Sequence, residues 1–173
     1  MVPGMSVEQV LVFTRLAADR VAPTKMDRPE DVQPSPVTGK VYVACTKNAD
    51  RTPAQVDGAN PRAANKFGHV VEITEKRNDS AALTFAWSLV LVCGDPADPS
   101  TYFSGYDPAK VSPISCPDNV AFDRSGNLWI STDGQADAIG TTTRCTRFRS
   151  VAASAVTCNS SCPCRPARRP PAR

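Results

Sequence analysis

RPEDVQPSPVTGKVYVACTKN, residues 28–48, decides the fold, because an altered copy of it, CPDNVAFDRSGNLWISTDG, occupies residues 116–134. Pro29 aligns with Pro117, and with one residue of slack in the loop Gly39 aligns with Gly126. The two prolines lie 88 residues apart (117 minus 29), about twice the 40 to 50 residues of a propeller blade. The repeat therefore predicts a β-propeller whose two copies lie two blades apart.

Each copy follows one plan: a proline, a carboxylate, an apolar residue, a Gly-containing turn and an alternating segment such as Val41-Tyr42-Val43. Alternation with β-branched and aromatic residues indicates a strand. In a propeller, equivalent loops of successive blades converge on the central channel. The repeated acids Glu30 and Asp118 would then face one another, which favours a bound cation. The alternative is that the two acids only cap turns.

The length and charge of the chain point to one incomplete domain followed by a different tail. The 173 residues suffice for a core but are few for a whole propeller, so we expect a mainly β, partial β-propeller with an incomplete set of blades. Residues 141–173 contain seven Arg and no acid, whereas residues 1–140 hold the other 13 basic and all 17 acidic side chains, a net of −4.

The cysteines and the apolar runs give no targeting or redox signature. Seven cysteines at irregular spacing do not form a disulfide framework, and Cys162-Pro163-Cys164 lacks a zinc-motif spacer. No apolar run reaches membrane-spanning length, and the first 20 residues have no signal-peptide pattern. As written, the chain is expected to stay in the cytoplasm and to bind no membrane.

Other segments carry more local predictions. Ser6 to Gln9 has the pattern of a capping box, so residues 6–20 should form one amphipathic helix packed on the propeller rim. The polar loop 48–65 contains Asn60, Arg62 and Asn65, which could donate to an anion or belong to a solvated linker.

Two segments are predicted as strands of the first part of the chain. The sole histidine, His69, opens one of them, and without a partner histidine it is better explained as a strand-end packing residue than as a catalytic base. Residues 82–92, ALTFAWSLVLV, should form a buried strand with a bulge near Ser88.

Three stretches, MDRPEDVQPSPVTGKVYVACTKN, NPRAANKFGHVVEI and SPISCPDNVAFDRSGNLWISTDG, together resemble the PhoX-type bacterial alkaline phosphatases. The resemblance covers about residues 4–140. It implies a β-propeller with added helical elements, calcium and iron as cofactors, a phosphate monoester as substrate and no nucleic-acid partner. It also implies that intact members are monomers exported by the twin-arginine route to the periplasm or the extracellular space.

The resemblance assigns roles to particular residues. The arginine of the family's Arg-Pro-Glu motif contacts substrate phosphate and the glutamate ligates metal, which places these catalytic roles on Arg28 and Glu30. A guanidinium matches phosphate oxygens, and hard cations prefer oxygen ligands. From the repeat, we add Asp118 and Asn119 as calcium ligands. Asn60 and Arg62 are expected to assist Arg28 in binding substrate.

The resemblance also shows what the chain lacks. Family members are longer, and they use a metal-bridging cysteine and further acidic ligands from an N-terminal lobe; Cys45, Cys93 and Cys116 match none of these in context. We therefore expect an interior fragment that is inactive alone. The alternatives are a non-catalytic calcium-binding propeller fragment and a lactonase-like propeller hydrolase, although a lactone offers no phosphate for Arg28.

The resemblance ends near Gly140, where the composition changes. Reading a GC-rich coding sequence for residues 143–168 two bases later can give an alternating, hairpin-like product. We therefore interpret residues 141–173 as an out-of-frame, disordered basic tail. The alternative is a native basic tail that binds nucleic acid or another anionic surface.

Overall fold

The larger sheet is built around β2 (Val41–Cys45) and β3 (His69–Glu75), whose β-branched residues Val43, Val70 and Val71 are buried. The computed structural model describes residues 2–133, 138–140 and 145–149. Five antiparallel strands follow in the order β1-β2-β3-β4-β5. They are β1 (Pro29–Pro34), β2 (Val41–Cys45), β3 (His69–Glu75), β4 (Phe85–Val92) and β5 (Tyr102–Phe103).

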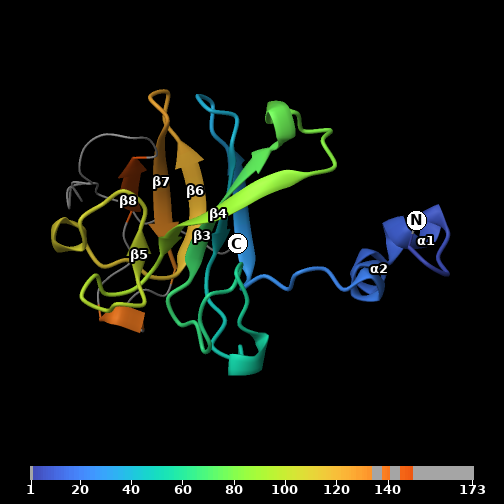
Figure 1. Ribbon diagram of the computed structural model, residues 1–173, viewed down its shortest axis with the longest axis horizontal. Helices are drawn as coiled ribbons and strands as arrows, with labels where there is room; N and C mark the ends of the chain where they lie inside the picture. The colour runs from blue at the N-terminus through green and yellow to red at the C-terminus, as the bar shows by residue number, and fades with distance from the viewer. Residues whose placement is uncertain (1, 134–137, 141–144, 150–173) are drawn as a thin grey trace, which may run out of the picture.

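A second sheet of three strands packs beside the first (Figure 1). It contains β6 (Pro117–Phe122), β7 (Asn127–Thr132) and β8 (Cys145–Arg149) in that order. One hydrophobic cluster spans both sheets, and within it the ring of Tyr42 packs edge-on, at 5.1 Å between centroids, against Phe122. Its largest fully buried aliphatic side chains are Leu91, Leu128, Ile130 and Val70. Burying this apolar surface is what joins the sheets.

The architecture confirms the mainly β, partial propeller with short N-terminal helices, but the two copies of the repeat are closer than predicted. The first copy forms β1 and β2, the second forms β6 and β7, and β1 lies against β6. The copies therefore open neighbouring sheets and are not two blades apart. The long loops after Cys45 and after Val92, not an additional blade, account for the wide spacing.

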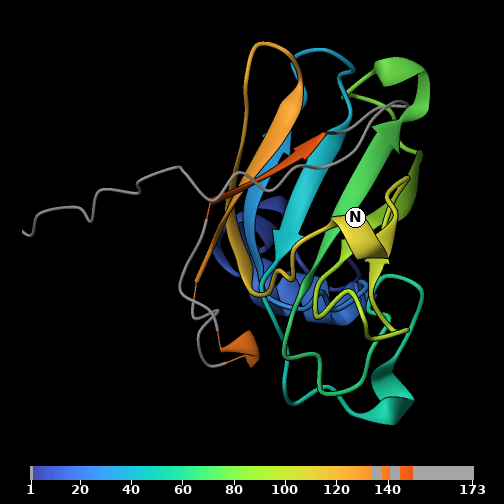
Figure 2. The same ribbon diagram turned by 90° about the vertical axis from the view of Figure 1, so that its left-hand side faces the viewer.

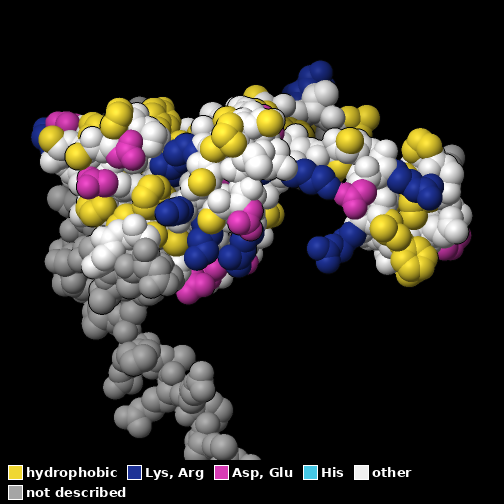
Figure 3. All heavy atoms as spheres, turned by 90° about the horizontal axis from the view of Figure 1, so that it is seen from below, with side chains coloured by type: hydrophobic (Ala, Val, Ile, Leu, Met, Phe, Trp, Pro, Cys, Tyr) yellow, Lys and Arg dark blue, Asp and Glu magenta, His cyan; other side chains and the backbone are white. Residues whose placement is uncertain are grey.

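The N-terminal helical segment differs from the predicted single helix on the rim. It forms two helices, α1 (Val7–Val12) and α2 (Thr14–Val21), interrupted at Phe13. The capping box is confirmed, since Gln9 N donates to Ser6 Oγ at 3.2 Å and Ser6 N donates to Gln9 Oε1 at 2.9 Å. Figures 1 and 3 show the helical pair standing apart from the β body. Three short 3-10 turns cover Pro53–Gln55, Lys76–Asn78 and Pro108–Lys110.

Strand β4 is buried along only half of its length, contrary to the prediction. Phe85 and Trp87 are exposed, as is Leu83 just before the strand, and burial is complete only from Val90 onward. The bulge lies at Val90, because Val70 pairs with Leu91 while Val71 pairs with Leu89. This half of β4 pairs with the end of β3, from Phe85 opposite Glu75 to Ser88 opposite Glu72, at the edge of the larger sheet that lies to the right in Figure 2.

Strand β8 lies in the range predicted to be a disordered tail. Residues 145–149 pair antiparallel with β7, from Asn127 opposite Arg149 to Ser131 opposite Cys145. The predicted disorder is therefore wrong for residues 145–149. Most of the rest of the predicted tail lies outside the described residues. Within the described part of the chain, no helix has the length and apolar character to cross a membrane.

Gly68, just before β3, joins the two sheets at a point where only glycine fits. Its φ is +79°, and an added Cβ would lie 2.2 Å from Thr46 O, 2.4 Å from Cys45 O and 2.8 Å from Pro117 Cδ. We expect Gly68→Ala to lower the free energy of unfolding by about 2 to 4 kcal/mol, since it combines left-handed strain with a backbone clash. Urea unfolding measures the change.

Gly105→Ala is the matched control for Gly68→Ala. Gly105 has a similar φ of +75°, but an added Cβ would meet no atom within 4 Å. It should therefore cost only the backbone strain, about 1 kcal/mol. Equal losses in the two variants would contradict the packing role of Gly68.

Candidate functional site

The two copies of the repeat share an uncommon backbone turn just before their acidic residues. Arg28 and Cys116 have φ of 51° and 54° and precede Pro29 and Pro117. The Arg28 carbonyl accepts from Thr46 N at 3.0 Å, and the Cys116 carbonyl accepts from the equivalent Asp133 N at 2.9 Å. A non-glycine residue in the left-handed region is strained and marks a position where the surrounding structure dictates the conformation.

A break in strand register follows each turn and contains the predicted ligands. Pairing of β1 with β2 shifts between Pro29 and Asp31, which leaves Glu30 out of the ladder. Pairing of β6 with β7 shifts between Pro117 and Val120, which leaves out Asp118 and Asn119. Such bulges redirect side chains and are frequent beside active sites.

Two hydrogen bonds join the copies and bring these bulges together. Val120 N donates to Asp31 Oδ2 at 2.9 Å, and the buried Thr46 Oγ1 donates to Pro117 O at 2.9 Å. The sequence predicted that the two acids would face one another; the fold places both at the junction of the two sheets.

The pKa of the Asp118 carboxyl group responds to the charges of its neighbours at this junction. Partial burial raises its pKa above the usual value, and the negative charges of Asp133, Glu30 and Asp31 raise it further, while Arg28 opposes the shift. Three other acids and one arginine therefore act on the Asp118 carboxyl group here. Like-charged carboxylates held together favour a bound cation or proton.

Arg28 is the basic group of this site and is open to solvent. Its Nη2 donates to Glu30 Oε1 at 2.9 Å, and its side chain is 60% exposed. An exposed ion pair of this kind contributes little to stability. The guanidinium keeps further donors in a planar fork suited to a phosphate dianion.

The donor atoms at the junction suit a hard cation, but the described residues form only part of a coordination shell. Glu30, Asp118 and Asn119 offer oxygen atoms, the ligands that hard cations such as calcium prefer. In residues 2–133, 138–140 and 145–149, no group of three or more His, Cys, Asp or Glu side chains is arranged to hold a metal. Further oxygen ligands would be required for tight binding.

Asn60 and Arg62 lie in the loop between β2 and β3, and their side chains donate to groups inside and outside this loop. Asn60 is fully buried, and its Nδ2 donates to Lys25 O and to Asp57 Oδ1, both at 2.9 Å. Arg62 Nη2 donates to Cys93 O at 2.6 Å and to Asn65 Oδ1 at 2.9 Å. Their binding of substrate stays a prediction.

The buried histidine and cysteines have no exposed reactive group. His69 opens β3 fully buried, and burial lowers its pKa to about 4, so the ring is neutral at neutral pH. Burial raises the pKa of the Cys45 thiol to about 12 and raises that of Cys93 further. Both groups are therefore protonated thiols at neutral pH.

A buried polar network around Asp27, the residue before Arg28, was not predicted from the sequence. Arg51 Nε donates to Asp27 Oδ1 at 2.6 Å, and Asn65 Nδ2 donates to Asp27 Oδ2 at 3.0 Å. Asp27 is fully buried and Arg51 nearly so. The acid and the loop residues are 24 and 38 positions apart, so no local pattern links them; the adjacency of Asp27 to the Arg-Pro-Glu motif was the only signal.

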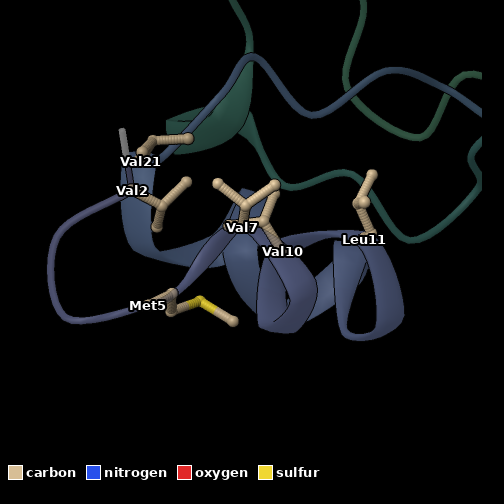
Figure 4. A pocket seen from close by; sticks show the side chains of 6 residues that line it. All are labelled: Val2, Met5, Val7, Val10, Leu11 and Val21. Carbon is tan, nitrogen blue, oxygen red and sulfur yellow. The ribbon is translucent and has the colours of Figure 1, made fainter.

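A pocket between the N-terminal helices is separate from this site (Figure 4). Its lining is entirely apolar: Val2, Met5, Val7, Val10, Leu11 and Val21. It contains no group that could pair with phosphate or a cation, so it does not serve the chemistry suggested by Arg28 and Glu30.

Asp118→Asn tests the charge at the junction through stability. A carboxyl group with a raised pKa binds its proton more tightly in the folded chain, so its stabilising contribution is present at low pH and is lost as pH rises through the folded pKa. We expect Asp118→Asn to raise the free energy of unfolding at pH 7 by less than about 1 kcal/mol, since the group is mostly solvent-screened.

The pH dependence separates this effect from a change in packing. The gain from Asp118→Asn should shrink as pH falls toward the ordinary aspartate value of 3.8, because the wild-type carboxyl group then becomes neutral as well. Thermal unfolding between pH 4 and 8 measures it. A gain that is constant with pH would contradict the proposed repulsion.

Together, these features define a mainly β, partial-propeller chain with an exposed arginine and clustered carboxylates where two sheets meet. The family model described as alkaline phosphatase PhoX matches residues 2–165. The chain therefore belongs to the PhoX alkaline phosphatase family.

A solved structure supports this placement. Pseudomonas fluorescens PhoX in complex with vanadate, a transition state analogue, is 36% identical, with a TM-score of 0.74. The match covers 84% of this chain and 27% of that one, so the chain spans about a quarter of the length of the solved relative. No curated protein matches the chain.

Proposed function

We propose that this chain carries the arginine and part of the carboxylate set of a metal-dependent phosphomonoesterase site. The observation that carries the proposal is the convergence of Arg28, Glu30 and Asp118 at the sheet junction. The solved relative that is 36% identical was obtained with vanadate bound. A phosphate monoester is the corresponding substrate class.

Arg28 is the group that would bind and orient the phosphate. Its guanidinium can pair with two phosphate oxygens at once and would stabilise the charge that develops on them during transfer. Glu30 holds the guanidinium from the side at 2.9 Å, so it limits the directions that the exposed side chain can take.

Glu30, Asp118 and Asn119 would hold cations, with calcium and iron as the proposed ions. When bound, such ions neutralise phosphate oxygens and activate an attacking oxygen. The oxygen donors and the raised pKa of Asp118 support this assignment. Because the described residues form an incomplete shell, we propose that turnover by this chain alone is far below that of a complete site.

Vanadate binding is the direct test of the proposed function. The whole chain, supplied with calcium and ferric ions, should bind vanadate by isothermal titration calorimetry and inorganic phosphate more weakly. Hydrolysis of p-nitrophenyl phosphate is measured in parallel. Calcium binding without vanadate binding would indicate instead a non-catalytic calcium-binding propeller piece, and hydrolysis of a lactone would indicate the lactonase-like alternative.

The proposals on the tail and on location remain separate from the site. We propose that a frameshift altered the sequence after about residue 140, although the family match to residue 165 and strand β8 both weigh against that position. The nucleotide sequence decides it. By resemblance, we also propose a periplasmic or extracellular location for the intact protein, which cell fractionation tests.

A further inference from the structure

The segment that leads into Arg28 is held by a network of buried side chains from the loop between β2 and β3. Asp27 accepts from Arg51 Nε at 2.6 Å on one carboxylate oxygen and from Asn65 Nδ2 at 3.0 Å on the other. The Lys25 carbonyl accepts from Arg51 Nη2 at 2.7 Å and from Asn60 Nδ2 at 2.9 Å. Lys25 and Asp27, which flank Met26, are therefore both hydrogen-bonded to the loop.

The loop that supplies these donors is itself fixed. Asn48 N donates to Asn65 O at 2.7 Å, and Ala64 N donates to Arg51 O at 2.8 Å, which closes the loop at its base. Arg51 Nη1 also donates to Gln55 O at 2.6 Å. The Asp27–Arg51 pair is almost completely inaccessible to water, so its charges are weakly screened.

Arg28 needs such a support, because its backbone conformation is unfavourable. It combines a φ of 51° with a following proline, and each of these restricts a residue that carries a Cβ. Its amide donates to Met26 O, and its carbonyl accepts from Thr46 N, both at 3.0 Å. Strained backbone persists only where its surroundings over-determine it.

We propose that Asp27, held by Arg51 and Asn65, is a positioning residue that keeps the Arg28 backbone in its left-handed turn and so directs the guanidinium to the carboxylates of the junction. Asp27 touches no substrate. It acts by fixing the turn from which the Arg28 side chain projects. The consequence for phosphate binding rests on the proposed function, whereas the control of the turn does not.

The variant Asp27→Asn tests the proposal, because it removes the charge while keeping the shape. The Thr46 amide, which donates to Arg28 O, should exchange its hydrogen at least about tenfold faster relative to the Asp133 amide. That amide makes the same bond to Cys116 O in the second copy. The ratio within one molecule cancels a general loss of stability. Arg51→Lys is made in parallel, so that a comparison stands if Asp27→Asn does not fold.

Glu72→Gln is the matched control. It breaks a different side-chain ion pair, Lys40 Nζ to Glu72 Oε1 at 2.7 Å, and should leave the exchange ratio unchanged. A ratio unchanged in both Asp27→Asn and Arg51→Lys would overturn the proposal. So would a change of equal size in Glu72→Gln.

Vanadate affinity distinguishes a positioning role of Asp27 from a purely structural one. Asp27→Asn should weaken vanadate binding about tenfold in the wild-type background and leave it unaffected in the Arg28→Ala background, because the two residues act through one group. Additive losses would overturn the proposal. A wild-type chain that binds no vanadate would defeat the proposed function, while the exchange ratio would still decide the positioning role of Asp27.

Discussion

Arg28→Ala should weaken vanadate binding to the cation-loaded chain by about 100-fold, and any hydrolysis of p-nitrophenyl phosphate should fall about 10²- to 10³-fold. The first value corresponds to the loss of a bidentate, charge-assisted contact, and the second to the loss of charge stabilisation in the transition state. Arg28→Lys should fall between the wild type and Arg28→Ala, because an ammonium keeps the charge without the planar fork.

Stability should change little in Arg28→Ala, since the ion pair that it breaks is exposed. Arg124→Ala is the matched control: Arg124 is an exposed arginine in the turn between β6 and β7, and its loss should leave vanadate affinity unaltered. Calorimetric titration measures both variants. Affinity retained in Arg28→Ala would remove Arg28 from the site and, with it, the main support for a phosphate substrate.

Glu30→Gln should act in opposite directions with and without cations. With calcium and ferric ions present, vanadate affinity should fall about 100-fold, because the amide no longer supplies the negative charge that hard cations prefer. Without cations, affinity should rise slightly, because the guanidinium of Arg28 is freed from its partner at 2.9 Å. The reversal distinguishes a ligand role from a role limited to holding Arg28.

Glu75→Gln is the control for this variant, since it neutralises an acid at the far end of β3, away from the junction. It should leave both titrations as in the wild type. Calcium binding, measured directly by calorimetry, should weaken in Glu30→Gln and not in Glu75→Gln. An unchanged calcium titration in Glu30→Gln would contradict the assignment of Glu30 as a ligand.

The internal repeat was sufficient to predict strands β2 and β7 and the acids that the junction brings together. Alternation in residues 41–43 and 127–132 gave β2 and β7, and the Pro-acid pattern marked Glu30 and Asp118. These are local properties: side-chain alternation, turn residues and a motif repeated along the chain. Such local patterns can be recognised in the sequence without the tertiary structure.

The relation between the copies could not be read in the same way. Spacing predicted blades two apart, and the structure places β1 beside β6 because loops, which add length without strands, fill the interval. The exposed half of β4 was missed for a related reason: an apolar run shows that burial is favourable but not which partner provides it.

By itself, the sequence determined strands β2, β3 and β7, the repeated acidic turn and the Arg-Pro-Glu motif, since all of these are encoded by neighbouring residues. Only the tertiary structure decided that Asp27 is buried against Arg51 and Asn65, and that Arg28 and Cys116 adopt the same strained turn. The physical reason is that a buried charge needs a partner from elsewhere in the chain. A left-handed φ at a non-glycine residue likewise survives only where distant contacts hold it.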